Sequence, residues 1–167
     1  MNLFIHQSTL KLIIFIAFLI PITSCKSSSS DHLKSYTVKE LLLPNNEKLK
    51  VFIADTSLRQ KKGLSKIKNE DFPSNAGMFF PGKRMYLRQF WMPETHFDLD
   101  VIFLNQGFYV LDIHRNLKHY TGKKRDRTNV PLSKEVLSQH VLEVKSKSKI
   151  SKMIKPGMVL RWTEKSL

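Results

Sequence analysis

The clearest β-hairpin in the sequence reads Asp100-Val-Ile-Phe-Leu104, Asn105-Gln106-Gly107 and Phe108-Tyr-Val-Leu-Asp-Ile113. Both apolar runs are rich in β-branched and aromatic residues, which favour strands. The short polar segment between them ends in glycine, which is typical of hairpin turns. Residues 100–113 therefore predict two neighbouring antiparallel strands.

Similar short runs lie on either side of this hairpin. The further expected strands are Tyr36–Leu43, Leu49–Ala54, Gly77–Phe80, Tyr86–Met92, His140–Val144 and Met158–Trp162. Turn residues such as Pro44-Asn45-Asn46 separate them. About eight short strands at this spacing favour a sandwich or barrel over a parallel sheet with helical crossovers. We predict one mainly β domain over residues 36–167.

Two short helices complete the predicted domain. Ser57 and Gln60 match a capping box, so a basic helix should run from about Leu58 to Lys62 and stop at Gly63. A second helix is expected over Ser148–Ile154, capped by Ser146 or Ser148.

The segment 1–24 has the pattern of a bacterial lipoprotein signal peptide. A polar start without acidic residues and Lys11 precede the apolar run Leu12–Ile20. This run is shorter than the roughly 20 residues that a helix needs to span a bilayer. Ile22-Thr23-Ser24-Cys25 resembles the lipobox, and Cys25 is the only cysteine of the chain. We expect cleavage before Cys25 and lipidation of its thiol, which would anchor the protein to a membrane.

Residues 25–35 are expected to form the lipidated cysteine and a flexible tether. The segment Lys26-Ser-Ser-Ser-Ser-Asp31 is polar and has no apolar anchor. Position 26 is lysine and not the aspartate that retains enterobacterial lipoproteins in the inner membrane. The expected location is therefore the cell envelope, with the outer membrane favoured over the inner.

The strong basic charge restricts the partners of an exported protein. The formal net charge is +14, and the leader contributes only Lys11 to it. A basic field attracts polyanions, and outside the cytoplasm anionic lipid or acidic glycan is nearer than nucleic acid, which we do not expect as a partner. The residues expected to touch an anionic surface are Lys123, Lys124, Arg125 and Arg127. The alternative is that this charge only solvates the surface and the loop.

The densest group of functional side chains lies in the loop between Phe90 and Asp100. An aromatic residue beside a carboxylate can stack on and hydrogen-bond a sugar. The candidate ligand-binding residues are Trp91, Glu94, Thr95, His96 and Asp100. Alternatively, Trp91 and Met92 pack in the core while Thr95 and Asp100 hold the loop in place.

Three carboxylates in this loop are candidates for catalysis. A glycosidase needs two carboxyl groups about 5 to 10 Å apart. Glu94, Asp98 and Asp100 are available. Asp98 and Asp100 would share one strand face, which permits a pair.

Other kinds of chemistry have no matching pattern in the sequence. The histidines His96, His114, His119 and His140 lack metal-ligand spacing, and no nucleotide or serine-nucleophile motif is present. We therefore expect no metal and no cofactor.

Five short motifs occur in the order found in one family. They are Arg59-x-x-x-Gly63-Leu64, Gly77-Met78-Phe79-Phe80, Phe90-Trp91-Met92-x-x-Thr95-x-x-x-Leu99-Asp100-x-x-Phe103, Val141-Leu142-Glu143 and Ile154-Lys155-Pro156-Gly157. Over roughly residues 49 to 162 the chain resembles the bacterial and archaeal domain of unknown function 192. The resemblance implies a compact, mostly antiparallel β fold of jelly-roll-like or barrel type, and it implies no known activity.

The chain departs from this family pattern at two places. Pro93-Glu94-Thr95 stands where Lys-Asn-Thr is usual, and Met158 stands where the family has aspartate after Pro-Gly. Our leading hypothesis is a non-enzymatic, lipid-anchored module that binds a glycan or a protein at the envelope. The alternatives are an envelope enzyme that acts on a polysaccharide through the loop Glu94–Asp100, and a purely structural lipoprotein. The sequence leaves the oligomeric state open.

Overall fold

A computed structural model describes residues 29–122 and 128–163. The predicted signal peptide, Cys25 and the four basic residues Lys123, Lys124, Arg125 and Arg127 lie outside the described residues. Within the described part, no helix is long and apolar enough to cross a membrane.

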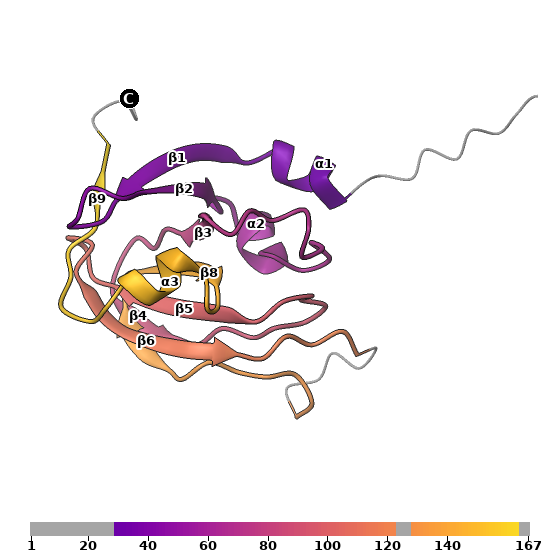
Figure 1. Cartoon of the computed structure of the whole chain (residues 1–167). Coiled ribbons are helices and arrows are strands. Elements are labelled where there is room, and N and C mark those ends of the chain that lie inside the picture. The colour runs from indigo at the N-terminus through magenta and orange to yellow at the C-terminus, as the bar shows by residue number, and fades with distance from the viewer. Residues whose placement is uncertain (1–28, 123–127, 164–167) are drawn as a thin grey trace, which may run out of the picture.

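The described residues form nine strands and three short helices. In chain order these are α1 (Ser29–Lys34), β1 (Thr37–Leu42), β2 (Lys48–Ile53), α2 (Ser57–Lys62), β3 (Ala76–Phe80), β4 (Tyr86–Arg88), β5 (Leu99–Leu104), β6 (Val110–Leu117), β7 (Val136–Ser138), β8 (His140–Lys145), α3 (Lys149–Met153) and β9 (Arg161–Trp162). The predicted mainly β fold is therefore confirmed (Figure 1).

Seven of the strands form one curled sheet in the order β6-β5-β8-β3-β2-β1-β9, and β4 pairs with β7 in a separate small sheet. The predicted hairpin is present as β5 and β6, which pair antiparallel. The pair β2 and β3 is parallel, unlike the other strand pairs of the described residues. It is parallel because α2 and the loop after it carry the chain back, so that β3 starts beside the start of β2.

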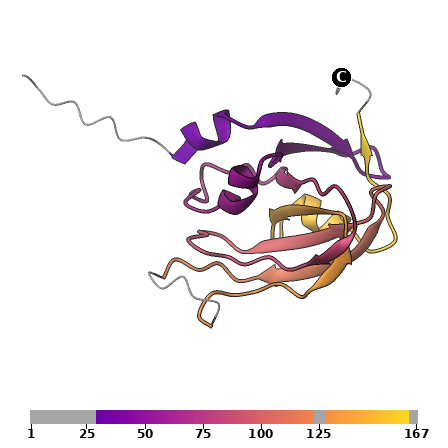
Figure 2. The same ribbon diagram turned by 180° about the vertical axis from the view of Figure 1, so that it is seen from behind.

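The end of the chain closes this sheet into a barrel. β9 pairs with β1 at one edge, while Tyr109, just before β6, forms an isolated bridge with Val159. The backbone N–H of Val110 donates to the carbonyl of Met158 (2.8 Å), and that of Leu160 donates to Phe108 (3.1 Å). Residues 158–162 therefore connect both edges, which Figure 2 shows from behind.

Alternation along the strands gives the sheet an apolar surface on each face. We call the cluster that includes Phe79, Leu142 and Ile154 of the α3 segment the inner core. The cluster that includes Met78, Phe80 and Val141 we call the outer core. The outer core includes Leu33 of α1 and several residues of the long loops, and one of these loops carries Trp91.

Regular structure begins earlier in the chain than the sequence predicted. The tether was expected to extend to residue 35, whereas α1 occupies Ser29–Lys34. Leu33 and Tyr36 are buried in the outer core, which gives this segment a reason to dock. The Arg59 guanidinium donates to the Ser35 carbonyl (2.6 Å) and joins α1 to α2.

Smaller differences concern caps and strand ends. The N-cap of α2 is Thr56, whose hydroxyl accepts from the Arg59 N–H, and not Ser57 of the expected capping box. The expected strand over 86–92 ends at Arg88, because the chain then pairs with residues 131–133 instead of with β7. The expected strand over 158–162 is reduced to Arg161–Trp162. The predicted cap of α3 by Ser148 is confirmed.

Candidate functional site

The loop that carries Trp91 is held by hydrogen bonds on both sides. The backbone N–H of Phe90 donates to the Ser133 hydroxyl (2.8 Å), and the Ser133 N–H donates to the Phe90 carbonyl (2.7 Å). On the other side, the Ser65 hydroxyl donates to the Pro93 carbonyl (2.7 Å). The loop is therefore a fixed part of the scaffold, although it has no regular strand structure.

A small cavity of about 40 Å³ lies between this loop, the end of α2 and the outer face of the sheet. Trp91 borders the cavity and is 40% exposed, whereas its neighbour Met92 is 1% exposed. Thr95 also borders the cavity and is buried. Trp91 is thus a cavity-lining residue that is partly open to solvent. Of the two residues that the alternative interpretation placed in the core, Met92 is buried and Trp91 is not.

Glu143 on β8 forms part of the cavity wall. Its register partners are Met78 on β3 and Val101 on β5, both of which are fully buried in the outer core. Glu143 is 4% exposed, and within residues 29–122 and 128–163 no side chain or backbone group donates a hydrogen bond to its carboxylate. This burial raises the pKa of Glu143 to about 8. The carboxyl group is therefore mostly protonated at neutral pH.

Two wider hollows adjoin the cavity, and Trp91 lines both. One has a volume of about 490 Å³ and includes Tyr86 and Leu87 of β4. The other has a volume of about 370 Å³ and includes Leu58, Lys66 and Glu94. Trp91 consequently lies where three concave surfaces meet.

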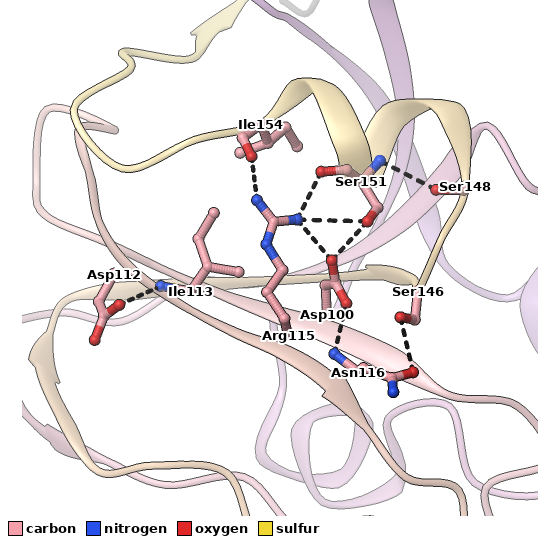
Figure 3. A network of polar contacts seen from close by, with 9 residues as sticks. All are labelled: Asp100, Asp112, Ile113, Arg115, Asn116, Ser146, Ser148, Ser151 and Ile154. Carbon is pink, nitrogen blue, oxygen red and sulfur yellow. Dashed lines mark hydrogen bonds and ion pairs between the residues drawn. The ribbon is translucent and has the colours of Figure 1, made fainter.

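Asp100 is held in a separate network on the inner face of the sheet. It is 1% exposed and accepts hydrogen bonds from the Ser151 hydroxyl (2.6 Å) and the Asn116 N–H (2.8 Å). The Arg115 guanidinium donates to the same carboxylate (2.6 Å) and to the carbonyls of Ser151 and Ile154, as Figure 3 shows. Burial by itself would raise the pKa of Asp100, but the hydrogen bonds outweigh it and hold that pKa below its usual value. This network attaches the α3 segment to β5 and β6.

Asp98 belongs to a third group of contacts, separate from the cavity and from the Asp100 network. It accepts from the Lys118 ammonium (3.0 Å) and from the backbone and ring of His119 (3.0 and 2.7 Å). Burial opposes ionisation, but these contacts outweigh it and lower the pKa of Asp98 to about 2. With both Asp98 and Asp100 ionised at neutral pH, neither carboxyl group can serve as the protonated acid that glycoside cleavage requires.

The structure thus divides the site residues predicted from the sequence. Trp91 and Thr95 border the cavity, and Glu94 borders the adjoining hollow beside Trp91. His96 is exposed and lines a separate hollow of about 240 Å³ together with Asp98. Asp100 borders neither the cavity nor the hollows beside Trp91.

Glu143 was not among the candidates proposed from the sequence. Its signal was present, since an acidic residue interrupts the apolar strand pattern His140-Val-Leu-Glu-Val144 at a position that should face the core. Gln60, on α2, also borders the cavity and was considered only as a capping residue.

Residues from the separate sequence motifs meet at this cavity. Its lining includes, from four of the five motifs, Gly63, Leu64, Phe80, Phe90, Trp91, Met92, Thr95, Leu99 and Glu143. The fold and the cavity define a small closed β-barrel domain in which the buried Glu143 and the exposed Trp91 line the same cavity. The chain belongs to the family DUF192, described as "Uncharacterized ACR", whose model matches residues 41–162.

Two solved structures share this fold. A protein from Sinorhizobium meliloti 1021, described as a "putative transcription regulator", is 21% identical with a TM-score of 0.62, and the match covers 77% of this chain and 95% of that one. A protein of unknown function from Novosphingobium aromaticivorans DSM 12444 is 25% identical with a TM-score of 0.60, and the match covers 76% of this chain and 85% of that one. No curated protein matches the sequence.

Proposed function

We propose that this protein is a lipid-anchored, non-enzymatic binding domain of the cell envelope that takes a glycan at Trp91. The observation that carries the proposal is the half-open indole of Trp91 at the junction of three concave surfaces. An exposed aromatic face stacks on the apolar face of a sugar ring, while nearby polar groups fix its orientation. Gln60, Thr95 and Glu143 supply such groups at the cavity.

Binding is favoured over polysaccharide cleavage by the state of the carboxylates. Asp98 and Asp100 are each held by cationic and hydrogen-bonding partners in networks of their own. Glu143 is the one carboxyl group lining the cavity among the described residues. A pair of carboxyl groups across one cleft, which glycoside hydrolysis uses, therefore has no counterpart in that lining. The two adjoining hollows each have one carboxyl group in their described lining, Glu135 in one and Glu94 in the other.

The envelope setting of the proposal comes from the sequence. The lipobox-like Ile22-Thr23-Ser24-Cys25 provides the anchor, and the basic composition suits a surface of anionic lipid or acidic glycan. Lys26 after the cysteine favours the outer membrane.

An array of bacterial and plant oligosaccharides tests this function, with the full-length protein purified in detergent. The variants are Trp91→Ala and, as the control, Tyr109→Ala, which removes an aromatic ring of similar exposure (42%) that does not line the cavity or the hollows beside Trp91. We expect binding by the wild type and by Tyr109→Ala, and at least a tenfold loss in Trp91→Ala, which corresponds to about 1.4 kcal/mol or more. Absence of binding by the wild type, or equal binding by a folded Trp91→Ala, contradicts the proposal.

A further inference from the structure

The cavity beside Trp91 combines one carboxyl group with aromatic walls. Glu143 forms part of its lining, and the aromatic residues Phe80, Phe90 and Trp91 form other parts. We propose that this cavity is a subsite for a primary ammonium group of the ligand, with Glu143 as its counter-ion. The inference rests on the proposed function and names the chemical group by which the glycan would be recognised.

The size of the cavity decides what kind of group can enter. The cavity volume is about 40 Å³. A cavity needs roughly 10 to 15 Å³ on this scale to hold one water molecule, so this cavity has room for a few water-sized groups and not for a sugar ring. Only a small terminal group, of the size of an ammonium or a hydroxyl, therefore fits at Glu143 while the rest of the ligand lies against Trp91.

The aromatic lining favours a cation over a hydroxyl group. The rings of Phe80 and Phe90 meet edge to face at a centroid distance of 5.0 Å. A cation over an aromatic face is attracted by the electrostatic field of the ring, and Glu143 adds a negative charge once it is ionised. A hydroxyl group would gain a hydrogen bond from Glu143 but no comparable attraction to the rings.

No cation of the described residues is placed to neutralise Glu143. On the neighbouring strands it faces Met78 and Val101, which carry no charge. Lys61 and Lys62 of α2 also line the cavity, but burial is the one influence on the pKa of Glu143, so neither ammonium acts on its carboxyl group. Lys61 is exposed, and the ammonium of Lys62 lies 2.9 Å from a ring nitrogen of His32. Arg88 lies over the Phe90 ring (5.5 Å) but donates to the Gln139 carbonyl. The charge that an ionised Glu143 needs must therefore come from the ligand.

This arrangement couples binding to the release of a proton. Because the pKa of Glu143 is raised to about 8 in the free protein, the ammonium can pair with it only after the carboxyl group loses its proton. The affinity for an amine should therefore rise about tenfold for each pH unit between about pH 6 and about pH 7. A neutral ligand held by the protonated carboxyl group would show no such rise.

The test uses two probes that differ in one group, 2-aminoethyl β-glucoside and 2-hydroxyethyl β-glucoside. Each is titrated calorimetrically into the full-length protein, into Glu143→Gln, and into Glu70→Gln as a control that removes an exposed carboxylate. We expect the wild type and Glu70→Gln to bind the amine at least tenfold more tightly near pH 7. Glu143→Gln should lose this preference, because its amide keeps the shape but not the charge.

Failure of this inference can be told apart from failure of the proposed function. Equal, Trp91-dependent binding of both glucosides overturns the ammonium subsite and leaves glycan binding intact. If neither glucoside binds, ethylammonium chloride provides an independent arm. A rise in Tm relative to sodium chloride, present in the wild type and absent in Glu143→Gln, supports the subsite. No rise in the wild type overturns it.

Discussion

Glu143 lowers the stability of the folded protein at neutral pH. Its pKa is about 8 in the fold against a usual value of 4.5, so the folded state holds this proton more tightly than the unfolded state does. The free energy of unfolding is therefore highest below the usual pKa and falls as the pH rises toward 8. A buried carboxyl group that is kept at such a cost is more readily explained by a ligand than by packing.

Glu143→Gln should remove this pH dependence. Because each pH unit in this range costs about 1.4 kcal/mol, the variant should gain about 2 to 3 kcal/mol relative to the wild type between about pH 5.5 and about pH 7.5. Urea unfolding followed by circular dichroism at the two pH values measures the difference. Glu70→Gln is the control and should follow the wild type. Parallel changes in the wild type and Glu143→Gln would show that Glu143 is not desolvated in the fold.

Asp100 stabilises the folded protein at neutral pH, in contrast to Glu143. Asp100→Asn leaves the Arg115 guanidinium without its carboxylate, and Arg115 is partly exposed. We therefore expect a loss of about 2 kcal/mol in the free energy of unfolding, measured in urea. The control is Asp112→Asn, which breaks the more exposed ion pair with Lys134. Loss of that pair should cost about 0 to 1 kcal/mol.

The pH dependence of this loss is a second check on Asp100. The folded-state pKa of Asp100 is lowered, so its contribution is complete above 3.8 and disappears as the pH falls through the lowered value. The difference between the wild type and Asp100→Asn should therefore shrink in acid. A difference that is independent of pH would mean that the ion pair is not what stabilises α3.

At the scale of elements, the sequence predicted what local patterns determine. The hairpin 100–113 has a glycine turn between two apolar runs, and it is present as β5 and β6. Ser148 has the chemistry of a cap and caps α3. The short strand β7 and the helix α1 were missed, because β7 pairs only with the three-residue β4 and α1 is stabilised by contacts with distant residues such as Arg59.

The candidate site was only partly predictable for the same reason. The loop around Trp91 was identified because unusual side chains follow one another there. Glu143 lies far along the chain, and it joins Trp91 only because β8 pairs between β3 and β5. That strand order is a long-range property that no local pattern encodes.

The contact between β3 and β8 gives a prediction at Gly77. A Cβ atom at this position would lie 2.8 Å from Leu142 Cδ1 and 3.0 Å from the Glu143 carbonyl oxygen. Gly77→Ala should therefore push the two strands apart and cost about 1 to 3 kcal/mol in thermal or urea unfolding. Gly107→Ala is the matched control, because its added methyl group meets only Asn105 Oδ1 at 3.6 Å. If both variants unfold alike, β3 and β8 are not packed as closely as described.

At the scale of the molecule, the cavity lies beside α2, the helix that contacts α1. α1 contacts α2 through Arg59 and Lys62, and the end of α2 forms one wall of the cavity. Figure 1 shows the two helices side by side. Only residues 26–28 separate Cys25 from α1. Because an extended residue spans at most about 3.6 Å, lipid on Cys25 would hold α1 close to the membrane surface. A ligand of this cavity would then be found on molecules of the envelope itself.

Cys25→Ser tests the anchor on which this arrangement depends. The wild type, expressed in a bacterium that processes lipoproteins, should sediment with the membrane fraction and should carry diacylglycerol on Cys25 by mass spectrometry of its N-terminal peptide. Cys25→Ser should keep its leader or appear in the soluble fraction. Because the protein is strongly basic, both membrane fractions are first washed with concentrated salt. Salt at about 1 M reduces the range of electrostatic attraction to about 3 Å and leaves an acyl anchor in place. Ser27→Ala is the control and should behave like the wild type. An unacylated Cys25 in the wild type, or salt-resistant sedimentation of a processed Cys25→Ser, contradicts the anchor, and the positive charge must then be explained by another polyanion.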